Sequence, residues 1–492
     1  MESSDILVRA TGWEQSPEKE RFPLSPIAQT MPKIYVLMAE VFPLAPDGSP
    51  SPGTIVKNMT AGLQHTLSQF PALAATLEMD AESGRMWAAK NRDSGVHLHV
   101  KYMAKDEFPT YMDLNERDFP AALLDGNKLL PTSVTAKQLH SPDGNNDAEG
   151  IPLVVLQLNF IQGGLVLGIA VHHVLSDGPG CDGFLTTWAE NTISVTQGLP
   201  FQPMGYVLDH SSPPFHVDPP SPSRFNDIKD AYPVLKDAGG PMAAPPPGFQ
   251  MPTLVPQMWH FPKTRLTKLK SKASGTTPQG ANADGWISTY DAIMALLWSR
   301  ITAAKVPLLQ PDINTASTTL VHAVNTRGVW ADPALPDRFI GSAAVQARSG
   351  PLLIRDVIAT PQTLPATAST VRSSIRQLTL PYLLGMLEWI TGHKDQRYLE
   401  TDVNSFLGLD LGGSSWQGIT AYERHDFGFG LPHAVRWPSP PFEGFVFLYP
   451  SRASFKEEGA DEGIEVCVCL EESCHKRLLV DEVLAQYAHP RG

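Results

Sequence analysis

The chain has 492 residues, 42% of them hydrophobic, and its 38 Lys and Arg against 51 Asp and Glu give a formal net charge of −13. Such an acidic chain repels polyanions, which argues against nucleic acid and anionic membranes as its main partners. Because one hydrophobic core rarely serves more than ~250–300 residues, the length predicts two domains.

The sequence also gives no sign of export or of a disulfide framework. It has no run of about 18 uninterrupted apolar residues, and residues 1–5 lack the basic and then apolar profile of a signal peptide. We therefore expect a soluble, cytoplasmic protein. Its four cysteines are too few for a disulfide framework. Three of them lie near His475, but the alternating pattern of residues 464–470 favours a strand over a metal site.

The first half of the chain has the pattern of alternating strands and helices. Residues 34–42 are typical of a strand, and apolar residues at every fourth position from Ile55 to Leu67 predict a helix that packs against a sheet. The helix is expected to end before Pro71. This alternation favours an α/β fold.

A predicted β-hairpin leads to the most informative segment. Its strands, at about 152–160 and 164–171, are joined by a Gly-rich turn and run into the motif HHxxxDG, which spans residues 172–178. A histidine at a strand end can be held by the backbone while its ring faces a cleft, and an unperturbed pKa of ~6.5 suits a general base. The motif therefore makes His173 a candidate base. A helix is expected to begin just beyond Asp182.

A Pro-rich stretch at about 205–256 separates the two halves. Prolines at this density disfavour helix interiors and central strands, so we expect an extended connector. The second half begins with a strand at 258–261. The capping-box pattern from Ser288 to Asp291 predicts the start of a helix that runs through Trp298.

A run of five cations without an acid follows the first strand of the second half. Two interpretations stay open: a solvated helix face, or a contact for the phosphates of a ligand. The run consists of Lys263, Arg265, Lys268, Lys270 and Lys272.

Several segments together resemble the BAHD family of acyl-CoA-dependent acyltransferases. Besides HHxxxDG they are FPALA at 70–74, VNTR at 324–327, SSW at 414–416 and DFGFG at 426–430. They occur in the family's order, and the resemblance extends from about residue 24 to 485. One departure is Phe429, where most members have Trp, because Phe has no N–H donor.

The resemblance implies an α/β fold of two chloramphenicol-acetyltransferase-like domains with a channel at their interface. The N-terminal domain, 1–204, would carry HHxxxDG and the C-terminal domain, 257–492, would carry DFGFG, with 205–256 as a crossover loop. It also implies a monomeric enzyme that moves an acyl group from acyl-CoA to a hydroxyl of a secondary metabolite such as a terpenoid, polyketide or alkaloid. Members of the fungal branch, which this chain resembles most, favour acetyl as that group. Acyl-CoA is then a co-substrate, and no permanently bound cofactor and no metal is expected.

The resemblance also assigns roles to single residues. His173 would be the catalytic base, without a covalent intermediate. Asp177 is the motif's aspartate, which would hold the turn through an ion pair with an arginine rather than act on the imidazole. Asp426 and Arg327 would form a second ion pair. The residues expected to bind coenzyme A are Lys268 and Lys270, those expected to shape the backbone are Gly178, Gly428 and Gly430, and His172 would pack inside.

Two other functions are weighed against this one. A condensation-type acyltransferase would use the same base but take an acyl or polyketide donor from a carrier protein. A degenerate family member would only bind a ligand, and the intact HHxxxDG and DFGFG motifs argue against that interpretation.

Overall fold

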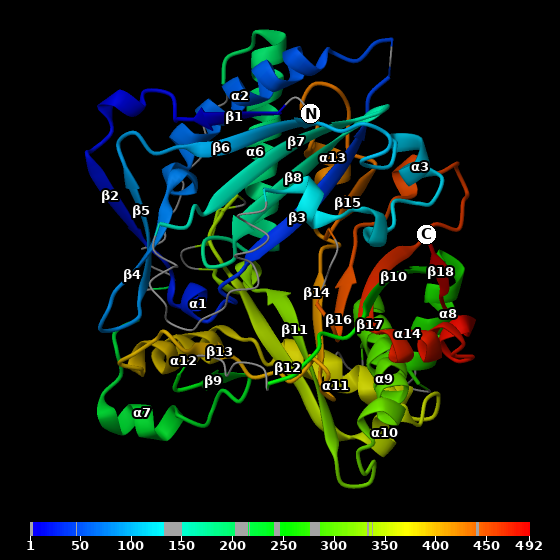
Figure 1. Cartoon of the computed structure of the whole chain (residues 1–492). Coiled ribbons are helices and arrows are strands. Elements are labelled where there is room, and N and C mark those ends of the chain that lie inside the picture. Colours follow the sequence, from blue (N-terminus) through cyan, green and yellow to red (C-terminus); the bar gives the residue numbers. More distant parts are fainter. Residues whose placement is uncertain are drawn as a thin grey trace.

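The computed structural model describes residues 3–492 except 46, 132–149, 202–214, 216, 241–246, 276–285, 332–333, 337 and 439–441. Two large mixed sheets organise this part of the chain (Figure 1). One has six strands and one has seven, and two small sheets of two and three strands complete them. The layered α/β fold expected from the sequence is confirmed.

The first large sheet carries the HHxxxDG segment. Helices α2 (Pro52–Gln69) and α6 (Gly178–Gln197) lie together against it (Figure 1), and the indole N–H of Trp188 donates to the Met59 carbonyl between them at 2.9 Å. The strands, in spatial order, are β1 (Ser3–Val8), β6 (Val96–Tyr102), β7 (Val154–Ile161), β8 (Gly164–His172), β3 (Tyr35–Pro43) and β15 (Ala434–Arg436).

The second large sheet shares a hydrophobic core with α9 (Thr289–Leu309). This helix contacts α8 (Lys263–Ala273), α10 (Ile354–Ile358), α11 (Leu364–Arg376) and α14 (Glu472–Leu479). Ser288 caps this helix in the capping box that the sequence predicted. The strands, in spatial order, are β12 (Ala344–Leu353), β11 (Ser317–Asn325), β14 (Leu411–Ser415), β16 (Phe445–Leu448), β17 (Ile464–Glu471), β10 (Leu254–Phe261) and β18 (His489–Arg491). Because β17 is a strand with buried Cys467 and Cys469, the strand interpretation of this segment is confirmed.

Shorter elements surround the two sheets. The small sheets are formed by β2 (Lys19–Pro23), β5 (Met86–Asn91) and β4 (Thr76–Met79), and by β13 (Leu399–Thr401) and β9 (Leu235–Asp237). The other helices are α1 (Pro26–Gln29), α3 (Tyr111–Asn115), α4 (Gly126–Leu129), α7 (Pro222–Ile228), α8 (Lys263–Ala273), α10 (Ile354–Ile358), α11 (Leu364–Arg376), α12 (Leu380–Gly392), α13 (Ala421–Arg424) and α14 (Glu472–Leu479).

The 205–256 stretch is more structured than an extended connector. It contains α7 and β9, and β10 begins inside it at Leu254. Pro222 does not prevent α7, because it occupies the first turn, where the missing N–H has no partner to lose. The expectation was therefore wrong for these segments. Residues 205–214, 216 and 241–246 of the stretch lie outside the described residues.

One strand crosses between the two halves of the chain. β15 comes from the C-terminal half but pairs antiparallel with β3 in the first sheet. Its Arg436 is fully buried and contacts the equally buried Glu465 of β17 at 2.8 Å. A buried ion pair thus connects the two sheets.

Among the described residues one helix, α9, is long and apolar enough to cross a membrane, and most of it is buried inside the protein. The contacts of α9 are those of a core helix.

Candidate active site

His173 lies in the turn that follows β8, where both halves of the chain hold its backbone. Its N–H donates to the carbonyl of Ile34 at 2.8 Å, and its carbonyl accepts from the hydroxyl of Ser342 at 3.1 Å. The residue as a whole is half-buried. Its Nδ1 is enclosed and has no hydrogen-bond partner among the described residues. The turn therefore fixes the backbone of His173 and encloses its Nδ1.

Burial sets the charge of this imidazole. It lowers the pKa of His173 below the usual value, although the residue's own carbonyl and Asp177 act in the opposite direction. A lower pKa means that the ring is neutral at pH 7. A neutral imidazole can accept a proton, which is what a general base must do.

His172 has the packing role that the sequence predicted. It is the last residue of β8, so its side chain points to the other face of the strand from that of Val171. Its ring is buried and meets the ring of Tyr35 edge-on, with the centroids 5.2 Å apart. Burial, with smaller contributions from His173 and Lys33, lowers the pKa of His172 to about 3.

Asp177 is a buried anchor whose carboxylate is saturated. Its oxygens accept from both terminal nitrogens of Arg327, at 2.8 and 2.9 Å. They also accept from the backbone N–H groups of Gly180, Ala343 and Ala344, at 2.8, 2.8 and 2.7 Å. His173 is not among these partners. The contacts are those of a residue that holds the turn, as expected, and not of a proton relay.

Arg327 belongs with Asp177 and not with Asp426, which corrects the pairing expected from the sequence. Besides its two bonds to Asp177, it donates to the carbonyls of Phe339 and Gly341, at 3.0 and 2.8 Å. Asp177 comes from the first half of the chain, and Arg327 follows β11 in the second. The pair therefore joins the two halves beside His173.

Asp426 instead shapes its own loop. One carboxylate oxygen accepts from the backbone N–H groups of Gly428 and Gly430, at 2.7 and 2.9 Å. Both glycines have positive φ, 88° and 106°, a conformation that side chains disfavour. Phe429, which replaces the family's Trp, packs edge-on against Phe42 at 5.2 Å between centroids.

Helix α6 begins earlier than predicted, at Gly178 rather than beyond Asp182, because Asp177 caps it. Gly178 lies beside the indole of Trp416, where a Cβ would be 3.5 Å from the ring. Gly180 lies closer still to the second half, since a Cβ there would be 2.4 Å from the carbonyl oxygen of Ile340. Gly180 thus allows the helix to approach the C-terminal half, whereas a side chain at position 178 would make only an ordinary contact.

A buried charge cluster beside this helix was missed by the sequence analysis. His425, which immediately precedes the DFGFG motif, is fully buried and contacts Glu40 of β3 at 2.7 Å and Asp182 of α6 at 3.2 Å. Burial opposes the charge, but Glu40 and Asp182 outweigh it and raise the pKa of His425 to about 9. A signal was present, because Glu40 is the only charged residue in the apolar run 34–42.

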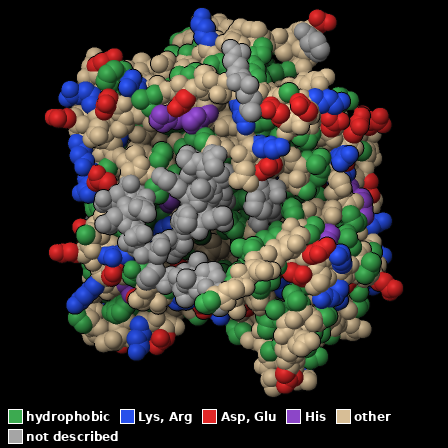
Figure 2. Space-filling view, viewed as in Figure 1, with side chains coloured by type: hydrophobic (Ala, Val, Ile, Leu, Met, Phe, Trp, Pro, Cys, Tyr) green, Lys and Arg blue, Asp and Glu red, His purple; other side chains and the backbone are tan. Residues whose placement is uncertain are grey.

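The basic run forms α8, and both lysines expected to bind coenzyme A lie over aromatic rings. The ammonium group of Lys268 is 5.9 Å from the ring centre of Tyr487, and that of Lys270 is 5.4 Å from the ring centre of Trp286. Cationic and acidic side chains are interspersed over the face shown in Figure 2. A role of Lys268 and Lys270 in phosphate binding stays a prediction.

Known proteins resemble this chain over nearly its whole length. The sequence profile of the Transferase family matches residues 11–477. The acetyltransferase FGR3 of Gibberella zeae is 29% identical over 98% of this chain and 93% of its own. The trichothecene 3-O-acetyltransferase TRI101 of Fusarium sporotrichioides is 27% identical over 92% of this chain and 93% of its own.

Solved structures show the same fold. TRI101 of F. graminearum, complexed with coenzyme A and deoxynivalenol, superimposes with a TM-score of 0.75 at 20% identity, over 96% of this chain and 99% of its own. Vinorine synthase gives 0.63 at 17% identity, over 99% and 98%. The two-domain fold expected from the sequence is thereby confirmed. The chain belongs to the Transferase family, the BAHD-type acyltransferases that its ordered motifs resemble.

Proposed function

We propose that this enzyme transfers an acyl group, acetyl in the first instance, from acyl-CoA to a hydroxyl of a secondary metabolite, with His173 as the general base. The observation that carries the proposal is the contrast within the motif. Nδ1 of His173 has no hydrogen-bond partner in another described residue, whereas the carboxylate of Asp177 accepts five hydrogen bonds. His173, rather than Asp177, is therefore the group that exchanges a proton, while His172 is buried against Tyr35.

The reaction needs one proton-transfer group and no side-chain nucleophile. Nε2 of His173 accepts the proton of the acceptor hydroxyl while the oxygen attacks the thioester carbonyl. The tetrahedral intermediate then expels the thiolate of coenzyme A, and the imidazolium returns the proton to that sulfur. Free coenzyme A and an ester leave, so no covalent acyl-enzyme forms.

The relatives support a free acyl-CoA donor. TRI101 of F. graminearum has been solved with coenzyme A together with deoxynivalenol or with T-2 mycotoxin. A donor bound to a carrier protein is therefore not favoured.

We further propose that the two substrates meet in a channel between domains 1–204 and 257–492. The same proposal includes a monomeric enzyme, because both halves of one chain hold His173. A cytoplasmic location is also part of the proposal.

Steady-state assays with purified protein test the donor. Acetyl-CoA and a panel of hydroxylated terpenoids, polyketides and alkaloids are supplied, free thiol is measured, and products are identified by mass spectrometry. We expect acceptor-dependent thiol release and a product heavier by one acetyl group. Acyl transfer from an acylated carrier protein, with none from acetyl-CoA or longer acyl-CoAs, would replace this proposal by the carrier-dependent one.

A further inference from the structure

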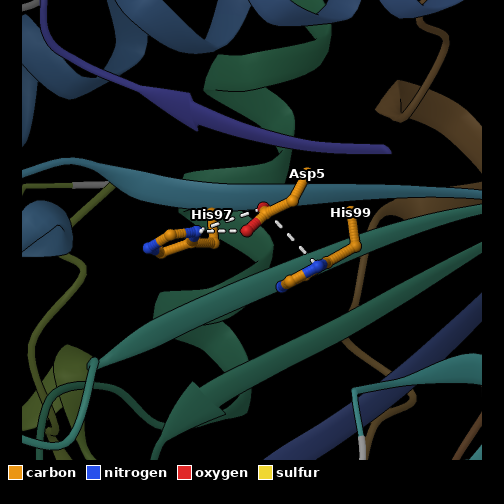
Figure 3. A group of neighbouring side chains, drawn as sticks. All are labelled: Asp5, His97 and His99. Carbon is orange, nitrogen blue, oxygen red and sulfur yellow. Dashed lines mark hydrogen bonds and ion pairs between the residues drawn. The ribbon is translucent and has the colours of Figure 1, made fainter. Parts of the chain in front are cut away.

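A histidine pair and an aspartate lie together at the edge of the first sheet, apart from the candidate active site. Asp5 of β1 is directly opposite His99 of β6, and His97 stands two residues before His99. Residues two apart on a strand point to the same face. Figure 3 shows the carboxylate of Asp5 directed at the rings of both histidines.

The distances between these side chains are those of a ligand set. Nδ1 of His97 is 3.0 Å and Nδ1 of His99 is 3.5 Å from the carboxylate oxygens of Asp5. One ligand atom from each of the three residues lies within 4.8 Å of the others. Metal–ligand bonds of ~2.0–2.2 Å separate the ligands of a tetrahedral ion by roughly 3.3–3.6 Å. Only small side-chain movements would therefore place all three around one ion.

The chemistry of the ligands selects the class of ion. Two imidazoles and one carboxylate suit zinc and similar divalent transition ions, whereas calcium and magnesium prefer oxygen alone. The exposed fractions of the side chains are 49% for Asp5, 44% for His97 and 28% for His99, which leaves room for water as a fourth ligand. Histidine side chains with an acidic one beside them are visible at the surface over β1 and β6 in Figure 2.

We propose that Asp5, His97 and His99 bind one zinc ion or a related divalent transition ion, which ties β1 to β6. Among the described strands, β1 lies at the edge of this sheet and pairs with β6 alone. An ion held by ligands from both strands would resist the separation of β1, because bound ligand stabilises the state that binds it. β7 separates β6 from β8 in the sheet. The ion is therefore structural and takes no part in acyl transfer.

Calorimetric titration of chelator-treated full-length protein with zinc tests the site. We expect one equivalent to bind, and His97→Gln, His99→Gln and Asp5→Asn each to weaken binding. Loss of a residue that only hydrogen-bonds to a metal ligand weakens metal binding by ~10–100-fold. Loss of a ligand itself should weaken zinc binding at this site at least as much. His475→Gln, which changes a partly exposed histidine elsewhere, is the matched control. The four cysteines are buried and will not compete.

A second measurement separates this site from incidental zinc binding. Hydrogen exchange of residues 3–8 should slow when zinc is added to the wild type, and should not change in Asp5→Asn. Absence of zinc binding by the wild type at micromolar concentrations would overturn the proposal. So would equal zinc affinity of the wild type and the three ligand variants.

Discussion

One strand of each large sheet ends at the candidate active site, and the residues that follow the two strands differ in their hydrogen bonding. After β8, the first sheet presents His173, whose Nδ1 has no hydrogen-bond partner in another described residue. After β11, the second sheet presents Arg327, whose guanidinium binds Asp177 and two carbonyls. A base must keep a lone pair free, whereas an anchor acts through the bonds that its donors make. Similar positions at strand ends therefore hold the candidate base in one half of the chain and a residue that joins the two halves in the other.

The largest effect is expected on turnover when His173 is replaced. Replacing it by Gln should reduce turnover by ~10²–10⁴-fold without changing the melting temperature, because a general base contributes about that much. Thiol release from acetyl-CoA and circular dichroism melting measure the two effects. A well-folded variant whose turnover stays within about tenfold of the wild type would exclude His173 as the base.

The pH profile of the wild type provides a second check on His173. Since burial lowers its pKa, the neutral base persists to lower pH than an exposed histidine would allow. The acidic limb of kcat/KM should then have its midpoint below ~6.5.

Changes at Asp177 should mainly alter the stability of the fold. Burial alone would raise the pKa of Asp177, but Arg327 and the backbone N–H groups lower it on balance, so the carboxylate is charged. Asp177→Asn leaves Arg327 without its counter-charge and should reduce the free energy of unfolding by ~3–5 kcal/mol. Urea unfolding measures this loss, and Arg327→Met in the same background should recover part of it. An inactive Asp177→Asn protein as stable as the wild type would assign Asp177 to the chemistry.

The charge cluster around His425 should make stability depend on pH. A histidine whose pKa is raised stabilises the fold fully below its unfolded pKa of ~6.5, and loses that contribution as pH rises through its folded pKa. Because the folded pKa is about 9, the loss falls between about pH 6.5 and 9 and is on the order of 3 kcal/mol. Urea unfolding at several pH values should show this decline, and His425→Gln should flatten it. A decline of the same size in the variant would place its origin elsewhere.

Replacing Asp426 should reduce the free energy of unfolding less than replacing Asp177, although both are aspartates of a family motif. Asp426→Ala removes the acceptor of two backbone N–H groups, but it leaves no arginine without a counter-charge. The loss in unfolding free energy should therefore be about 1–3 kcal/mol. Parallel urea unfolding of Asp426→Ala and Asp177→Asn makes the comparison. A loss for Asp426→Ala as large as that for Asp177→Asn would point to a missing charge partner.

The smallest effect is expected at the two lysines of α8. If Lys268 and Lys270 contact the phosphates of coenzyme A, changing both to Ala should raise the KM for acetyl-CoA and reduce its dependence on ionic strength, since salt screens exposed charges over ~8–10 Å. The acceptor's KM should not change. The double change Lys263→Ala and Lys272→Ala, on the same helix, is the matched control. Equal donor kinetics in both double variants would make the run a solvated helix face.

The sequence determined those features that short stretches of chain encode. Apolar periodicity located α2 and the strands around HHxxxDG, and Ser288 with Asp291 marked the start of α9, because caps and periodicity depend on neighbours a few residues away. The order of the motifs was enough to identify the family. His172 could be separated from His173 because only one of the two rings could face a cleft.

Only the tertiary structure decided which distant residues meet. Arg327 binds Asp177 across 150 positions of sequence, Glu40 meets His425 across 385, and β15 joins a sheet from the other half of the chain. A buried charge requires a partner, but the need can be met by any opposite charge that the fold brings near. Local sequence therefore shows that Asp177, Arg327 and Glu40 need partners, while the packing of the two halves selects them.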